Sequence, residues 1–185
     1  MHPTLRTAAA LTTLALAACD PGDPRVPTEL PPPFTPIVEL TYTGPLDGAW
    51  RAAGTLHIPS ANTTTWASGL RTGGRLEIQA IHQNADGTHD RVRIDIGHTT
   101  RGYAAIDASC SGPDCPGVLI AFGMRSEHGA QAAVTCQLRT GTLGIDEISP
   151  RHAYGRFSGT GSCLTSGGEH LEDFTLVGTF RVPLR

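Results

Sequence analysis

The stretch RLEIQAIHQNADGTHDRVRIDIG, residues 75–97, contains two runs in which apolar and polar residues alternate. Alternation with a period of two places the apolar side chains of each run on one face of a β-strand. Between the runs, residues 84–87 read NADG, which is rich in residues that favour tight turns. The stretch therefore predicts an antiparallel hairpin with one buried face. The residues of that face are Leu76, Ile78, Ala80, Val92, Ile94 and Ile96.

Shorter apolar runs follow along the chain, separated by Gly, Asn, Asp and Ser, and no run of ten or more residues has a clear helical period. We therefore expect an all-β domain. The predicted architecture is an antiparallel β-sandwich, with a small closed β-barrel as the alternative. The further strands are expected at Val38–Tyr42, Gly54–Ile58, Gly117–Met124, Gln131–Leu138, Gly141–Ile148, Ala153–Gly161 and Phe174–Val182.

The N-terminal segment has a charged residue, Arg6, followed by an apolar run from Thr7 to Ala18. The run has the length of a signal-peptide core and is too short to cross a bilayer. It ends in Leu16-Ala17-Ala18 directly before Cys19, and these four residues match a lipobox position by position. In this segment the chain resembles the bacterial lipoproteins that are processed by the lipoprotein signal peptidase. The resemblance implies that residues 1–18 are a signal peptide, that the processing machinery acts on the chain, and that the thiol of Cys19 carries the lipid that holds the protein to a cell-envelope membrane.

Residues 20–36, DPGDPRVPTELPPPFTP, contain seven of the 14 prolines of the chain. Proline fixes φ and removes a backbone donor, so this stretch can neither continue a helix nor lie inside a sheet. We expect residues 19–37 to form an extended tether and residues 38–185 to form a single β-domain. Without Arg6, 13 of the 14 basic side chains remain against 17 acidic ones, a formal charge of −4. This balance argues against nucleic acid as a partner.

Four cysteines remain besides Cys19, and an even number in an exported chain indicates two disulfides, for which three pairings are possible. If strands 135–148 and 152–163 are joined near residues 149–150, residues whose numbers sum to about 299 face each other across the ladder. Cys136 and Cys163 meet this condition, which leaves Cys110 and Cys115 to close the short loop CSGPDC. A zinc site is the less favoured reading because Cys136 and Cys163 stand alone in their strands.

Two histidines flank the predicted turn of the hairpin. A turn centred between Ala85 and Asp86 would set His82 opposite His89, and such a pair could ligate a cation. No third ligand is evident, so we favour a solvated hairpin end and predict no metal site and no cofactor.

The two tryptophans, Trp50 and Trp66, precede the hairpin. Exposed together, they could stack on sugar rings, which would make them the candidate ligand-binding residues. We favour a core position for both, because large apolar side chains are scarce in this sequence.

Known catalytic motifs are absent from the sequence: it has no Gly-x-Ser-x-Gly, His-Glu-x-x-His or phosphate-binding glycine motif. The acidic pairs Asp146/Glu147 and Glu172/Asp173 could in principle do acid/base work, but adjacent side chains in a strand point to opposite faces. We therefore predict no catalytic residue.

The C-terminal third carries FSGTGSC at 157–163 and FTLVGTFRVPL at 174–184. It looks like small uncharacterised β-domain lipoproteins in which two late strands each carry a Gly-Thr element. That resemblance implies an all-β fold and carries over no active site. The predicted function is a membrane-anchored envelope lipoprotein whose non-catalytic domain has a structural or interaction role toward an envelope protein or a glycan. The alternatives are a sugar- or lipid-binding β-domain and an envelope hydrolase whose residues converge only in three dimensions.

Overall fold

The computed structural model describes residues 34–54, 65–112, 114–124 and 132–185. These residues form ten β-strands, and no helix among them is long and apolar enough to cross a membrane. The predicted signal peptide, the lipobox with Cys19 and most of the tether lie outside the described residues. The strands are β1 (Ile37–Thr43), β2 (Gly48–Ala53), β3 (Thr65–Thr72), β4 (Arg75–Gln83), β5 (His89–Ile96), β6 (Gly102–Asp107), β7 (Gly117–Met124), β8 (Val134–Ile148), β9 (His152–Thr165) and β10 (His170–Pro183).

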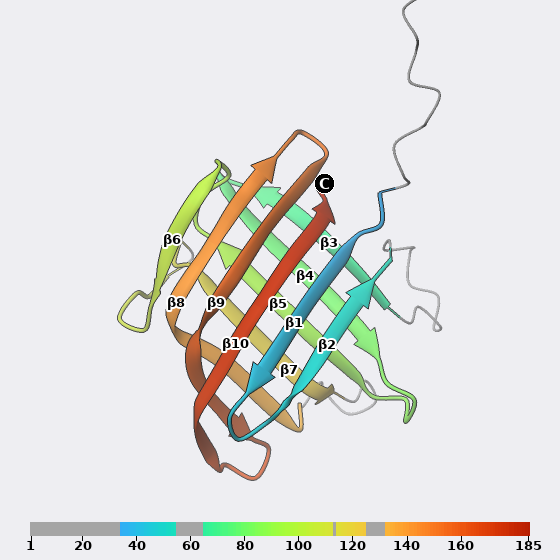
Figure 1. Ribbon diagram of the computed structural model, residues 1–185, viewed down its shortest axis with the longest axis vertical. Helices are drawn as coiled ribbons and strands as arrows, with labels where there is room; N and C mark the ends of the chain where they lie inside the picture. Colours follow the sequence, from blue (N-terminus) through green and yellow to red (C-terminus); the bar gives the residue numbers. More distant parts are fainter. Residues whose placement is uncertain (1–33, 55–64, 113, 125–131) are drawn as a thin grey trace, which may run out of the picture. The chain divides into compact units, whose positions relative to one another are not determined.

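The ten strands belong to one antiparallel sheet with the order β2-β1-β10-β9-β8-β7-β5-β4-β3, while β6 pairs with β8 beside this path. Figure 1 shows that the sheet curls on itself, so that β3, β4, β5 and β7 lie behind the other strands. The predicted all-β antiparallel class is confirmed. The two separate sheets of a sandwich are not found, and the nearly closed barrel is closer to the alternative.

A few backbone contacts connect β3, the strand at one end of the sheet, with residues that follow β10 and β2 near the other end. Gly69 of β3 forms a parallel bridge with Leu184, and the N–H of Arg185 donates to the carbonyl of Gly69 over 3.0 Å. Beside the edge strand β2, the N–H of Ala67 donates to the carbonyl of Gly54 over 3.1 Å. Because these contacts are isolated and no ladder joins β3 to β2 or β10, the barrel is nearly closed rather than closed.

The interior of the barrel is filled by the inward faces of its strands. The predicted hairpin is present as β4 and β5, and its apolar residues pair across the ladder as Leu76 with Ile96, Ile78 with Ile94 and Ala80 with Val92. All six are at most 1% exposed. Burying a leucine, isoleucine or valine side chain contributes roughly 1.5–3 kcal/mol relative to leaving it in water.

Two glycines make room for the largest core side chains. Gly155 of β9 faces Phe180 of β10, and Gly178 of β10 faces Phe157 of β9. A Cβ at Gly155 or Gly178 would lie 2.4 Å from a ring atom of the facing phenylalanine.

Both predicted disulfides are formed, Cys110–Cys115 and Cys136–Cys163. Cys136 and Cys163 face each other on β8 and β9, as expected, but the turn between these strands is centred one residue later than predicted, with Ile148 facing Ala153. Two β-bulges on β8, at Arg139 and Asp146, shift the register back by two. The two disulfides indicate an oxidising, extracytoplasmic environment.

The other strand predictions differ mainly in their limits. The strands predicted at Gln131–Leu138 and Gly141–Ile148 correspond to the single strand β8, which begins at Val134, and Gln131 lies outside the described residues. The strands β2, β3 and β6 were not predicted. The strand expected at Gly54–Ile58 lies mostly outside the described residues, and Gly54 itself follows the end of β2.

Candidate functional site

The two tryptophans occupy different environments. Trp50 is 6% exposed and belongs to the core, as we favoured. Trp66 lies on the face of β3 opposite the buried Ala67 and is half-buried, so the core position favoured for it is wrong. The structure does not bring the two indoles together as a stacking platform.

The two histidines of the hairpin do not face each other. The observed register sets His82 opposite Asp90 and His89 opposite Gln83, so the two imidazoles are on opposite faces of the hairpin. The Nδ1 atom of His82 is 3.0 Å from the carbonyl oxygen of Arg51, which lies across the barrel on β2. Within the described ranges, no three His, Cys, Asp or Glu residues are grouped as a metal site requires.

The turn between β8 and β9 brings a serine close to a histidine. The Oγ of Ser149 is 3.4 Å from Nδ1 of His152. The same oxygen accepts hydrogen bonds from the backbone N–H groups of Arg151, at 3.2 Å, and His152, at 3.0 Å. The His152 ring also stacks on Phe34, with 4.2 Å between centroids. Because the Ser149 oxygen is bonded to two backbone donors, we interpret this contact as the cap of a turn.

An exposed tyrosine lies flat on the outer surface of the barrel. Tyr103 of β6 faces Gly144 of β8, and a Cβ at Gly144 would lie 2.2 Å from Cδ1 of the ring. The missing side chain at Gly144 therefore lets the phenol ring lie directly on the backbone of β8. Tyr103 is 54% exposed, so the other side of the ring is open to solvent.

A carboxylate and a guanidinium hold the edge of this ring. The hydroxyl of Tyr103 donates to Oδ1 of Asp146, the residue at one of the two bulges of β8. Arg156 of β9 donates to the same carboxylate through Nη2, at 2.9 Å from Oδ1, and through Nε, at 3.1 Å from Oδ2. The guanidinium carbon of Arg156 is also 5.7 Å from the centre of the Tyr103 ring. The three side chains form one polar and aromatic unit.

The hydrogen bonds of this unit change the titration of its members. Those donated by Arg156 lower the pKa of Asp146 below its ordinary value, and the hydrogen bond to Asp146 raises the pKa of Tyr103. Asp146 is therefore ionised and Tyr103 neutral over the whole neutral range.

A second exposed tyrosine extends the surface. Tyr154 is 42% exposed and lies two residues before Arg156 on β9, on the same outer face. Strand spacing and rise place the Cα atoms of Tyr103 and Tyr154 about 12 Å apart. We call Tyr103, Asp146, Arg156 and Tyr154 the tyrosine platform.

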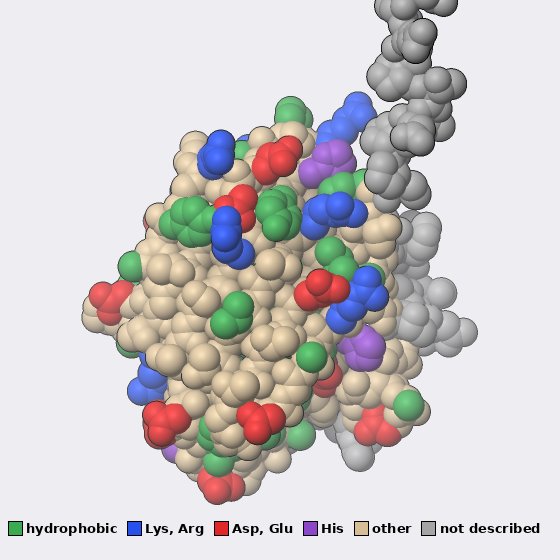
Figure 2. Space-filling model, in the orientation of Figure 1, with side chains coloured by type: hydrophobic (Ala, Val, Ile, Leu, Met, Phe, Trp, Pro, Cys, Tyr) green, Lys and Arg blue, Asp and Glu red, His purple; other side chains and the backbone are tan. Residues whose placement is uncertain are grey.

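Next to the platform, the outer face carries small hydroxyl side chains. Thr142 and Ser158 are 3.3 Å apart across β8 and β9, and Thr140 and Thr160 are 2.9 Å apart. Figure 2 shows this face: charged and apolar side chains gather over one end of the strands, and a broad area below them has little charge.

The sequence analysis did not predict the tyrosine platform, although the positions of the two tyrosines in their strands indicate that both are on the outer face. In β6 the buried residue is Ile106, and around Tyr154 in β9 the buried residues include Ala153 and Phe157. Tyr103 and Tyr154 are therefore out of phase with the buried faces of their own strands. An aromatic residue out of phase in this way is expected on the outside. The role of Gly144 as a seat for the ring needed the register of β6, a strand that the sequence did not reveal.

Comparison with known protein families, curated proteins and solved structures found no relative of this chain. No family model, no curated protein and no solved structure matches the chain.

Proposed function

We propose that this chain is a lipid-anchored envelope protein whose β-barrel has a binding role and takes a carbohydrate on the tyrosine platform. The anchoring part of the proposal rests on the lipobox at residues 16–19 and on the two disulfides, which fit an oxidising compartment. The binding part rests on the outer surface, because the described interior is occupied by core side chains.

The observation that carries the carbohydrate proposal is the flat, exposed ring of Tyr103 beside an ion pair. The C–H face of a sugar packs on an aromatic face, and its hydroxyls need donors and acceptors at the ring edge. Arg156 supplies N–H donors, with its side chain 64% exposed, and Asp146 supplies carboxylate oxygens. Since the ring lies on Gly144 and is bonded to Asp146, little side-chain entropy is lost on binding.

The neighbouring surface favours a chain of several sugars over a single sugar. Tyr103 and Tyr154 lie on one face with Arg156 between them in the ladder, so two rings of an oligosaccharide can be stacked at the same time. Beyond the platform, the hydroxyls of Thr142 and Ser158 offer uncharged hydrogen-bonding groups.

The test is isothermal titration of the domain with chitotetraose and cellotetraose, after a screen on an oligosaccharide array. Tyr103→Ala is expected to weaken binding by about tenfold or more, as the loss of one well-formed stacking contact requires. Leu70→Ala is the matched control, because Leu70 is 51% exposed and lies on β3, away from the platform. The proposal fails if the wild-type domain binds no oligosaccharide of the array, or if Tyr103→Ala binds as tightly as the wild type.

A further inference from the structure

A surface cavity lies where β8 changes its pairing partner. Residues 134–137 of β8 pair with β7, and residues 140–145 of the same strand pair with β6. The change falls at the bulge at Arg139. Because β7 and β6 diverge here, a cavity of about 480 Å³ opens at the surface. This volume is in the range of small-molecule sites.

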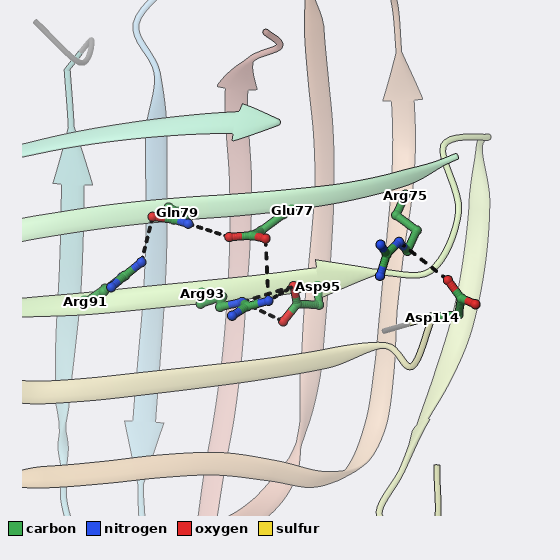
Figure 3. Close-up of polar contacts among 7 residues, drawn as sticks. All are labelled: Arg75, Glu77, Gln79, Arg91, Arg93, Asp95 and Asp114. Atoms are coloured by element: carbon green, nitrogen blue, oxygen red, sulfur yellow. Dashed lines mark hydrogen bonds and ion pairs between the residues drawn. The ribbon is translucent and has the colours of Figure 1, made fainter. Parts of the chain in front are cut away.

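One wall of the cavity is formed by Cys110 and Cys115, which are joined by a disulfide, and by Gly112 of the loop that this disulfide closes. Two contacts fix this loop on the barrel: Nε of Arg75 is 3.5 Å from Oδ1 of Asp114, and the backbone of Gly97 packs directly on the carbonyl of Asp114. The first of these contacts is visible in Figure 3. The cavity is therefore formed before any ligand binds.

Two opposite charges in the lining have no ionic partner. Among the described residues, the carboxylate of Asp107 accepts hydrogen bonds only from Ser109, through the backbone N–H and the hydroxyl, both at 2.8 Å. These bonds lower the pKa of Asp107, so its carboxylate is charged at neutral pH. Within the same described ranges, Arg139 is exposed and forms neither an ion pair nor a side-chain hydrogen bond.

The other charged residue of the lining is already neutralised. Asp95 is bound by Arg93, with 3.0 Å between Nε and Oδ2, and Arg93 also approaches Glu77, as Figure 3 shows. Among its described lining residues, the cavity therefore presents one carboxylate and one guanidinium that have no ionic partner, together with the amide of Gln137.

We propose that this cavity binds a small zwitterion of the α-amino-acid class. The planar guanidinium of Arg139 matches a carboxylate, with which it can form two parallel hydrogen bonds. The carboxylate of Asp107 matches an ammonium group. Asp107 pairs with Thr140, the residue after Arg139, so the two charges stand close enough for one small molecule to meet both.

The test is a titration of the ¹⁵N-labelled domain with L-alanine, followed by NMR, beside N-acetyl-L-alanine and L-alaninamide. These analogues lack the ammonium and the carboxylate, respectively. We expect saturable shifts confined to the cavity residues with L-alanine. Each analogue, and each of Arg139→Gln and Asp107→Asn, should weaken binding by about tenfold or more, as the loss of one charged hydrogen-bond partner requires.

Arg151→Gln is the matched control, because Arg151 is an exposed arginine in the turn between β8 and β9, outside the cavity. It should bind L-alanine as the wild type does. The proposal is overturned if L-alanine gives no saturable shifts at millimolar concentration, if both analogues bind as tightly as L-alanine, or if Arg139→Gln has no effect. Since Arg139 and Asp107 are exposed, both variants should keep the wild-type spectrum elsewhere.

Discussion

Removal of the Cys136–Cys163 disulfide should destabilise the domain more than removal of the Cys110–Cys115 disulfide. A crosslink lowers the entropy of the unfolded chain, and its effect grows with the length of the loop that it closes. The sequence separations are 27 and 5 residues. In the chain-entropy model, these loops correspond to about 3.5 and about 2 kcal/mol of unfolding free energy at 25 °C.

Burial increases this difference. Cys136 is 1% and Cys163 is 2% exposed, and both belong to the core, whereas Cys110 is exposed. Replacing the buried pair by alanine also removes sulfur atoms from a packed interior, which adds a cavity term. We therefore expect the difference between the two double variants to be at least about 1.5 kcal/mol, or tenfold in the unfolding equilibrium.

The assay is equilibrium unfolding in urea, monitored by circular dichroism, of C136A/C163A and C110A/C115A beside the wild type. With a slope of about 1–3 kcal/mol per molar urea, the core variant should unfold at a midpoint lower by at least about 1 M than that of the wild type. A loss of stability in C110A/C115A equal to or larger than that in C136A/C163A would refute the argument from loop length and burial.

Three further predictions concern the platform and the anchor. Gly144→Ala should displace the Tyr103 ring and weaken oligosaccharide binding as Tyr103→Ala does, at a cost of about 1–3 kcal/mol in urea unfolding; unchanged binding would contradict the seating of the ring. Oligosaccharide affinity should be constant from neutral pH down through the range in which an ordinary aspartate titrates, and it should fall only in stronger acid. The reason is that the pKa of Asp146 is lowered, so its carboxylate stays ionised until the pH falls below that value. Titration calorimetry at several pH values checks this prediction, and a decline in affinity already near pH 5 would contradict it. Cys19→Ala should leave an unprocessed, unlipidated precursor, and mass spectrometry that finds an acylated chain would disprove the lipobox assignment.

The hairpin shows how far alternation of residue types can be used. The apolar residues 76, 78, 80, 92, 94 and 96 predicted both strands and their buried face, because period two is a direct consequence of strand geometry. The same residues also restrict the register. All are even-numbered and share one face, so facing residues must have an even sum, and the observed sum is 172.

The residue numbers of His82 and His89 have an odd sum, so the even-sum rule excludes that these two residues face each other. The turn is centred on Asp86, where Asn84 N–H donates to the Thr88 carbonyl over 2.8 Å and Gly87 has a φ of +84°. A loop with glycine in this left-handed region is a common three-residue hairpin connection. One residue of difference in the turn moves His82 to the other face.

The unpredicted strands share a simple cause. β6 has the sequence GYAAID, in which Ile106 is the only residue that is 5% exposed or less, so its alternation is weak. β2 and β3 are rich in alanine, glycine and serine, whose small side chains mark the two faces of a strand poorly. Tertiary pairing supplies what these sequences lack, since β6 is held by β8 and β3 by β4.

The bulges of β8 connect the fold to both proposed sites. A bulge adds one residue to a strand and redirects the side chains around it. Arg139 and Asp146 are the two added residues: the first lines the cavity beside the Cys110–Cys115 loop, and the second receives the hydrogen bonds of Tyr103 and Arg156. A regular ladder from the turn at Ile148 would give neither residue this position and would also move Cys136 two residues away from Cys163. The disulfide therefore holds the register in which the bulges exist, so loss of this bond should disturb both proposed sites through β8.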